Sequence, residues 1–229
     1  MFDSKSNPVT PLFLILSMAF VTCLLISNII AGKLMTVGSV VLPAAVILFP
    51  ITYLLGDVLT EVYGFQRSRL VIWAGFACNV FMALAFMAAV ALPHPEFWGQ
   101  QRAYETVLGF TPRLVGASLL AYWVGEFSNS FVLSKMKVFT RGKWLWARTI
   151  GSTIVGEGLD TILFILLAFG GILPAEVLGG MMFAQYLWKV GFEIAATPLT
   201  YRLVSWAKTI DNVDAYDYDV HYNPFLLEV

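Results

Sequence analysis

Six long apolar stretches, separated by short polar segments, dominate the pattern of hydrophobic and polar positions along the chain. They cover residues 11–31, 40–62, 70–92, 114–133, 149–172 and 177–204. A helix of about 20 apolar residues spans a hydrocarbon core of roughly 30 Å. The pattern therefore predicts an all-α integral membrane protein with six transmembrane helices. The polar and aromatic segment 93–112 predicts a short helix or lid at the membrane surface.

The composition supports the same class of protein. Hydrophobic residues make up 59% of the 229 residues, charged residues make up 13%, and the mean hydropathy is +0.76, all far from soluble-domain averages. Nothing in the charge pattern supports nucleic-acid binding. We expect the protein to be embedded in the lipid bilayer. We predict a transmembrane domain over residues 1–208 and an acidic, tyrosine-rich cytoplasmic tail over 209–229, whose role the sequence leaves open.

Lys and Arg are distributed unequally between the two sides of the predicted bundle. One side receives Lys5, Arg67, Arg69, Lys135, Lys137, Arg141, Lys143, Arg148, Arg202 and Lys208, and the other receives only Lys33, Arg102 and Arg113. Short loops rich in Lys and Arg stay in the cytoplasm. Both termini are therefore predicted to be cytoplasmic.

Acidic side chains inside the apolar stretches are the most informative exceptions to the pattern. They are Asp57, Glu61, Glu126, Glu157, Asp160 and Glu193. A charged side chain at bilayer depth costs roughly 2.5 to 3.5 kcal/mol on insertion scales, so such residues face a polar interior. The six acids predict a site for a ligand that is rich in N–H donors or carries positive charge.

The spacing of these acids places several of them in pairs. Asp57 and Glu61 share one helix face, as do Glu157 and Asp160. Two carboxylates close together in a low dielectric do not both ionise easily, which suits proton exchange or an N–H-rich substrate. The alternative for Asp57 and Glu61 is solvation among the cytoplasmic headgroups.

Three further residues extend the candidate site. Lys189 and Glu193 lie four residues apart, and the simplest alternative to a binding role is a mutual ion pair. Glu126 has Asn129 one turn further along and no cation nearby in sequence. Tyr53 lies beside the acids and could stack on a flat ring, although packing against the bilayer or the core is the more common role of such a residue.

The two halves of the sequence share short features. Ser27-Asn28 in the first span resembles Ser128-Asn129 in the fourth, and residues 56–61 (GDVLTE) resemble 156–161 (GEGLDT). Three spans in each half would give the halves opposite orientations, as in many transporters. The sequence is therefore compatible with two inverted three-helix repeats, although chance similarity explains such short matches too.

Four segments contain distinctive charged motifs: residues 27–33 (SNIIAGK), 49–69 (FPITYLLGDVLTEVYGFQRSR), 125–137 (GEFSNSFVLSKMK) and 148–164 (RTIGSTIVGEGLDTILF). They resemble the motifs of the queuosine precursor transporter family, also grouped as vitamin uptake transporters. The resemblance implies a six-helix carrier of the bacterial inner membrane that imports 7-cyano-7-deazaguanine and 7-aminomethyl-7-deazaguanine. A guanine-like edge presents N–H donors to carboxylates. Base-edge recognition falls to Glu126 or Glu157, with Asn28, Asn129 and Gln185 as amide partners.

We predict a secondary, proton-linked carrier or facilitator, to which two other classes of protein are alternatives. The substrate-binding subunit of an ATP-driven vitamin importer would need ATPase partners, and the chain has no Gly-x-x-x-x-Gly-Lys-Ser/Thr motif. The chain contains no Gly-x-Ser-Gly or His-Glu-x-x-His motif, which argues against an intramembrane enzyme. We therefore expect no ATPase partner, no cofactor and no metal. Gly and Ala along the spans permit close helix contact and hence a homodimer.

Overall fold

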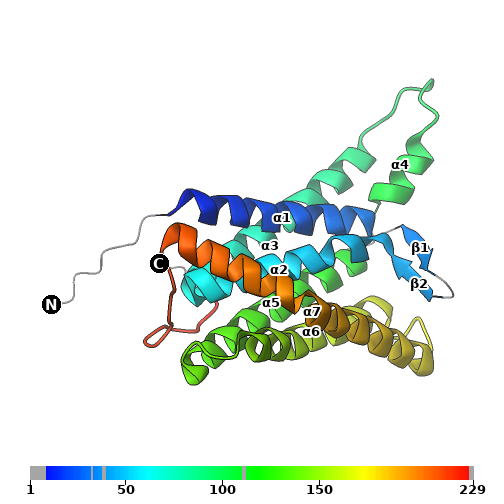
Figure 1. Cartoon of the computed structure of the whole chain (residues 1–229). Coiled ribbons are helices and arrows are strands. Elements are labelled where there is room, and N and C mark those ends of the chain that lie inside the picture. The colour runs from blue at the N-terminus through cyan, green and yellow to red at the C-terminus, as the bar shows by residue number, and fades with distance from the viewer. Residues whose placement is uncertain (1–8, 32, 38–39, 110–111, 227–229) are drawn as a thin grey trace.

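A computed structural model describes residues 9–31, 33–37, 40–109 and 112–226. The protein is a helical bundle with one small β-hairpin (Figure 1). In chain order the elements are α1 (Pro11–Ile30), β1 (Leu34–Val37), β2 (Val40–Pro43), the 3₁₀ helix η1 (Ala44–Ile47), α2 (Phe49–Tyr63), α3 (Phe65–Ala91), α4 (Gln101–Leu108), α5 (Pro112–Thr140), α6 (Leu145–Phe169) and α7 (Ala175–Asp211).

The six predicted spans correspond to six of these helices. The helices α1, α3, α5, α6 and α7 cover the first, third, fourth, fifth and sixth spans, and α4 is the short helix expected in segment 93–112. The helices α5 and α7 run past the predicted spans, and α7 extends through 37 residues to Asp211. The internal repeat stays a prediction.

The second span differs from the prediction, because only its last two thirds form a helix. Residues 40–43 form strand β2, which pairs antiparallel with β1 so that Val40 lies opposite Val37. Pro43 has no N–H to donate to a helix, and β-branched Val40 and Val41 favour a strand. Pro50 then lies in the first turn of α2, where proline is tolerated.

Within the described residues, four candidate membrane spans stand out by length and mean hydropathy. They are Pro11–Ile30, Phe65–Ala91, the stretch Gln101–Thr140 that contains α5, and Leu145–Phe169. Helix α2 has 15 residues, fewer than the roughly 17 that a spanning helix needs. Helix α7 is long enough but carries Lys189 and Glu193 in its middle. Both of these helices contribute to the polar interior described below.

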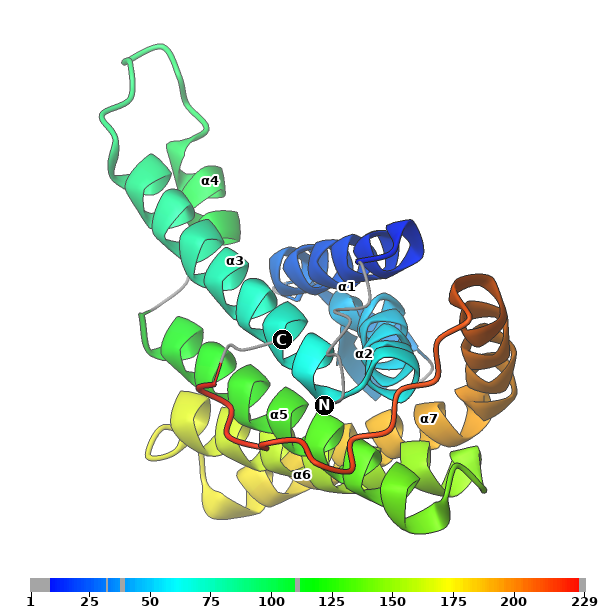
Figure 2. The same ribbon diagram turned by 90° about the vertical axis from the view of Figure 1, so that its left-hand side faces the viewer.

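The bundle has two distinguishable ends. At one end α2 turns into α3 at Gly64, and residues 212–226 follow α7 without helix or strand. We call this the tail end, and residues 212–226 the tail segment. The β-hairpin and α4 lie at the opposite end (Figure 1). Viewed at 90°, the tail segment lies over α5 (Figure 2), and its hydrogen bonds with Phe65 and Trp73 join it to α3. The predicted tail is thus packed on the bundle.

Helices α5 and α6 pack closely because two glycines face each other. A Cβ atom at Gly156 would lie 2.6 Å from Asn129 Cβ and 2.8 Å from the carbonyl oxygen of Gly125. A Cβ atom at Gly125 would lie 2.8 Å from Asp160 Cβ. Small residues let helix backbones approach in a membrane. This crossing brings the polar residues of α5 against those of α6.

We expect Gly156→Ala to destabilise the protein by about 1–3 kcal/mol, because its methyl group would press against backbone and the helices would have to separate. Gly158→Ala on the same helix is the matched control, since its Cβ would lie 3.5 Å from Tyr186, an ordinary contact. Thermal unfolding in detergent measures both. Equal midpoints for the two variants would contradict the close crossing.

Candidate functional site

A central acidic cluster lies where α2, α5, α6 and α7 meet. It contains Asp57 of α2, Glu126 and Asn129 of α5, Glu157 and Asp160 of α6, and Lys189 and Glu193 of α7. Seven of the eleven sequence-predicted site residues belong to it, and Tyr53 lies at its edge. The structure therefore brings together residues that are up to 136 positions apart, Asp57 and Glu193 being the most distant.

Asp57 and Asn129 form the best-defined contact in the cluster. The Asn129 side-chain amide donates to Asp57 Oδ1 over 2.9 Å, and Asp57 is 1% exposed. Asp57 Oδ2, Asn129 Oδ1 and Glu193 Oε1 are buried and accept no hydrogen bond from any described residue. Glu193 and Glu126 both lie within electrostatic range of Asp57. Buried acceptors of this kind are costly unless a donor meets them.

Lys189 neutralises the α6 carboxylates. Its Nζ lies 2.7 Å from Glu157 Oε2 and also contacts Asp160 Oδ2. The ammonium lies 5.6 Å from the centre of the Tyr53 ring. The alternative of a mutual ion pair between Lys189 and Glu193 is not among the ion pairs of the described residues, because the ammonium reaches across to α6 instead of along its own helix. That alternative was wrong.

This contact predicts a pattern of coupling. Lys189→Gln should destabilise the protein, and Asp160→Asn in the same chain should recover part of the loss, with a coupling free energy of about 0.5–3 kcal/mol. The same cycle between Lys189 and Glu193 should be nearly additive. Thermal unfolding of the single and double variants in detergent measures both cycles. A stronger coupling to Glu193 would contradict the observed pairing.

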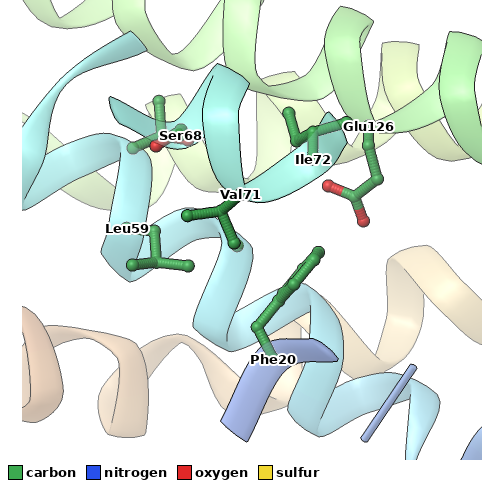
Figure 3. Close-up of a pocket in the computed structure, with 8 residues that line it drawn as sticks. Phe20, Leu59, Ser68, Val71, Ile72 and Glu126 are labelled. Carbon is green, nitrogen blue, oxygen red and sulfur yellow. The ribbon is translucent and has the colours of Figure 1, made fainter. Parts of the chain in front are cut away.

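Glu126 faces a small cavity between α1, α2, α3 and α5. The lining residues are Phe20, Gly56, Leu59, Thr60, Ser68, Val71, Ile72 and Glu126. Figure 3 shows the Glu126 carboxylate directed toward the Phe20 ring. The cavity volume is about 10 Å³, room for about one water molecule. A purine-sized ligand would therefore require the helices to move apart.

The charges of the cluster do not balance. Five carboxylates, those of Asp57, Glu126, Glu157, Asp160 and Glu193, share the single ammonium of Lys189. Ion pairs with Arg or a second Lys do not occur in this cluster among the described residues. The cluster thus offers a surplus of hydrogen-bond acceptors and negative charge, which suits a ligand with N–H donors or a cation, including protons.

Glu61 belongs to a second polar group, nearer the tail end. It is 0% exposed and accepts from Arg148 Nη2 at 2.8 Å and from Lys208 Nζ at 2.9 Å, while Lys137 Nζ lies 3.6 Å away. Asp214 of the tail segment completes the group at 2.5 Å from Lys137 and 2.9 Å from Lys208. We call these five residues the Glu61 network.

The environment of Asp214 keeps its carboxyl ionised. Burial alone would raise the pKa, but hydrogen bonds and positive charge from Lys137 and Lys208 outweigh burial, and the pKa lies below its ordinary value. The sequence interpretation placed Lys137 and Arg148 in a basic cytoplasmic loop. Both are in fact buried, because α5 continues to Thr140 and α6 begins at Leu145. The absence of Gly or Pro from residues 126–141 was the signal for a longer α5.

The three other predicted residues, Asn28, Gln185 and Tyr53, lie outside the central acidic cluster or at its edge. The Asn28 amide donates to Asn79 Oδ1 over 2.6 Å and so joins α1 to α3. Gln185 is half-buried one turn before Lys189 and makes no hydrogen bond with the described residues. Tyr53 is half-buried and stacks on Phe49, with ring centres 6.2 Å apart. Binding roles for these residues stay predictions.

Buried acids enclosed by apolar helices of membrane-spanning length define a multi-pass membrane transport protein. The sequence profile of a family described as "Putative vitamin uptake transporter" matches residues 43–203. This chain belongs to that family.

A curated relative matches the chain as well. The "Probable queuosine precursor transporter" of Bacillus subtilis (strain 168) is 32% identical over 146 residues, which cover 63% of this chain and 64% of the relative. The match thus spans less than two thirds of the relative's length. No solved structure matches the chain.

Proposed function

We propose that this protein imports queuosine precursors, 7-cyano-7-deazaguanine and 7-aminomethyl-7-deazaguanine, across a bacterial inner membrane. The acceptor surplus of the central acidic cluster is the observation that carries the proposal. The family membership and the name of the Bacillus subtilis relative support it. The excess of Lys and Arg on one side supports an orientation with both termini in the cytoplasm.

The chemistry of a guanine-like edge matches the unpartnered acceptors of the cluster. Its adjacent N–H groups would donate to Asp57, Glu126 or Glu157, and its carbonyl would accept from the Asn129 amide once Asp57 is drawn to the ligand. Tyr53 would stack on the flat ring. An aminomethyl group would bind a second acid, Asp160 or Glu193.

Three of the predicted site residues take different places in this proposal. Glu61 is already matched by three cations, so we assign it to holding the tail end together. Asn28 joins α1 to α3 outside the cluster, and Gln185 is half-buried on α7, so we assign both to contact with the substrate on its way in or out. A homodimer remains compatible with the exposed helix faces.

Growth of a queuosine-auxotrophic bacterium on limiting precursor tests the substrate. Cells that produce the protein should contain queuosine in their tRNA, and cells that produce the Glu126→Gln protein should not. Glu96→Gln is the matched control, because Glu96 lies exposed between α3 and α4. Equal queuosine content with and without the protein would refute the proposed substrate.

We further propose that a proton gradient drives uptake without an ATPase partner. Five carboxylates around one lysine titrate as a coupled group, so binding of an N–H-rich base would shift their protonation. In liposomes that contain only this protein, a pH difference with the acidic side outside should raise the internal concentration of labelled precursor above the external concentration. A facilitator would reach equal concentrations at any pH difference, and an ATP-driven importer would transport nothing without its partners.

A further inference from the structure

The tail segment is bonded to the corner between α2 and α3. The backbone N–H of Phe65 donates to Asp217 Oδ2 over 2.9 Å, and the N–H of Ala215 donates to the carbonyl oxygen of Val62 over 3.0 Å. Arg69 Nη1 donates to the carbonyl oxygens of His221 and Asn223. Asp217 is 8% exposed, so this anchoring carboxylate is nearly enclosed.

The same residues of the tail segment also hold α5. Ser134 Oγ donates to Asp217 Oδ2 over 2.5 Å and lies 2.9 Å from the Tyr222 hydroxyl. Lys137 donates to the carbonyl oxygen of Ala215 over 2.7 Å. Asp217 therefore accepts from α3 and α5 at once and is the point at which the two elements are joined.

The last part of the tail segment packs on an aromatic surface shared by α3 and α5. Trp73 Nε1 donates to the carbonyl oxygen of Pro224 over 2.7 Å. The Phe225 ring lies 6.0 Å from Trp73 and 5.6 Å from Trp123, measured between ring centres. Phe225 is nevertheless 66% exposed. The contact is therefore shallow, and the ring leaves it without opening the bundle core.

These contacts join the first half of the chain to the second at one end of the bundle. Helices α2 and α3 belong to the first half and α5 to the second. One turn before Ser134, the Ser130 hydroxyl of α5 lies 2.9 Å from the Thr60 hydroxyl of α2. Separation of α2 from α5 at this end would break the bonds of Asp217 to one side or the other, together with the contact of Lys137 with Glu61, to which Asp214 of the tail segment also belongs. A segment without helix or strand, held by separate hydrogen bonds, detaches at a lower free energy than a packed helix.

We propose that the tail segment is a latch that keeps the tail end of the bundle closed, and that its release lets α2 and α5 separate there. The contacts of the latch do not depend on the proposed transport function, but its purpose does. In a transporter the latch would control the opening toward the side that the Lys and Arg distribution predicts to be cytoplasmic. Asp217 is the positioning residue of the latch.

Thiol labelling at two depths tests the latch in the purified full chain, held in lipid nanodiscs. Ser134→Cys reports detachment of the tail segment, because its partners Asp217 and Tyr222 cover it. Ser130→Cys, one turn deeper, reports separation of α2 from α5. Both are made in a chain whose Cys23 and Cys78 are replaced by alanine. A soluble maleimide is the probe, and Asp219→Ala, an exposed acid of the same segment, is the matched control.

Asp217→Ala should raise the labelling rate at both positions by roughly tenfold or more, since each hydrogen bond to a charged group contributes at least a tenfold factor in an equilibrium. Asp219→Ala should leave both rates unchanged. A rise at position 134 alone would mean that the tail segment detaches without any opening, and the latch would be wrong. Unchanged rates at both positions would overturn it as well.

A second variant protects the test against misfolding. Phe225→Ala removes only a ring that is mostly exposed, so the bundle stays folded, and labelling at positions 134 and 130 should rise together by about threefold. No rise at position 130 in either variant overturns the latch. Neither labelling measurement uses the substrate. If the protein fails to restore queuosine in the growth experiment, the proposed function is refuted, while the labelling rates still decide on the latch.

Discussion

Replacement of Glu126 or Glu157 by glutamine is expected to lower precursor uptake by roughly 10- to 100-fold while the protein still inserts and folds. A hydrogen bond to a charged group contributes about 1.5–3 kcal/mol, and glutamine has the same shape but supplies only one acceptor. An amide is also easier to bury in a membrane than a carboxylate. The loss of uptake should therefore occur without a loss of stability.

Initial rates with labelled precursor, corrected for the amount of protein in the membrane, measure this effect. Glu96→Gln again serves as the control for a change of charge outside the cluster. Wild-type uptake rates in both the Glu126 and the Glu157 variants would contradict a binding role and indicate that these acids are structural. A joint loss of uptake and of folded protein would show that the cluster holds the helices together and would remove the support for a binding role.

The largest loss of stability is expected at Glu61. Glu61→Gln leaves the buried cations Arg148 and Lys137 without their shared carboxylate, and removal of one partner of a buried ion pair costs about 3–5 kcal/mol. Lys208→Gln should cost at most about 1 kcal/mol, because Lys208 is 25% exposed and Glu61 keeps its other two cations.

Unfolding in mixed micelles of increasing denaturing detergent measures both variants. Glu176→Gln, at the exposed start of α7, provides the baseline for loss of an acidic charge. Comparable midpoints for the Glu61 and Glu176 variants would contradict a structural role. Uptake by the surviving Glu61→Gln protein adds a second readout, since a residue that only stabilises the bundle leaves the substrate affinity unchanged.

Much of the fold could be predicted, and the exceptions have local causes. Uniform hydropathy marked α1, α3 and α6 well because a spanning helix must be apolar along about 20 residues. The start of the second span was predicted wrongly as α-helix, because a short apolar run such as residues 40–47 is compatible with either a strand or a helix. Pro43 favours the hairpin. The ends of α5 and α7 were missed because polar residues such as Lys137 and Lys208 lower the hydropathy there, although both helices continue and bury part of these side chains.

The site was predicted in its composition and not in its contacts. Buried acids are detectable in sequence because charge inside an apolar span is rare. Helical spacing suggested that Lys189 pairs with Glu193, yet the ammonium reaches Glu157 and Asp160 on another helix. A neighbour four residues away competes with every group that tertiary packing brings closer, and spacing contains no information on that competition.

The sequence by itself determined the class of protein, the number of long helices and the acidic residues of its interior, because each of these depends on how one segment partitions between water and lipid. Only the tertiary structure decided that Asp57 meets Asn129, that Glu61 is enclosed by Arg148 and two lysines, and that the tail segment joins α3 to α5. Those contacts depend on the rotation and crossing of helices, which are fixed by close packing such as that of Gly125 against Gly156.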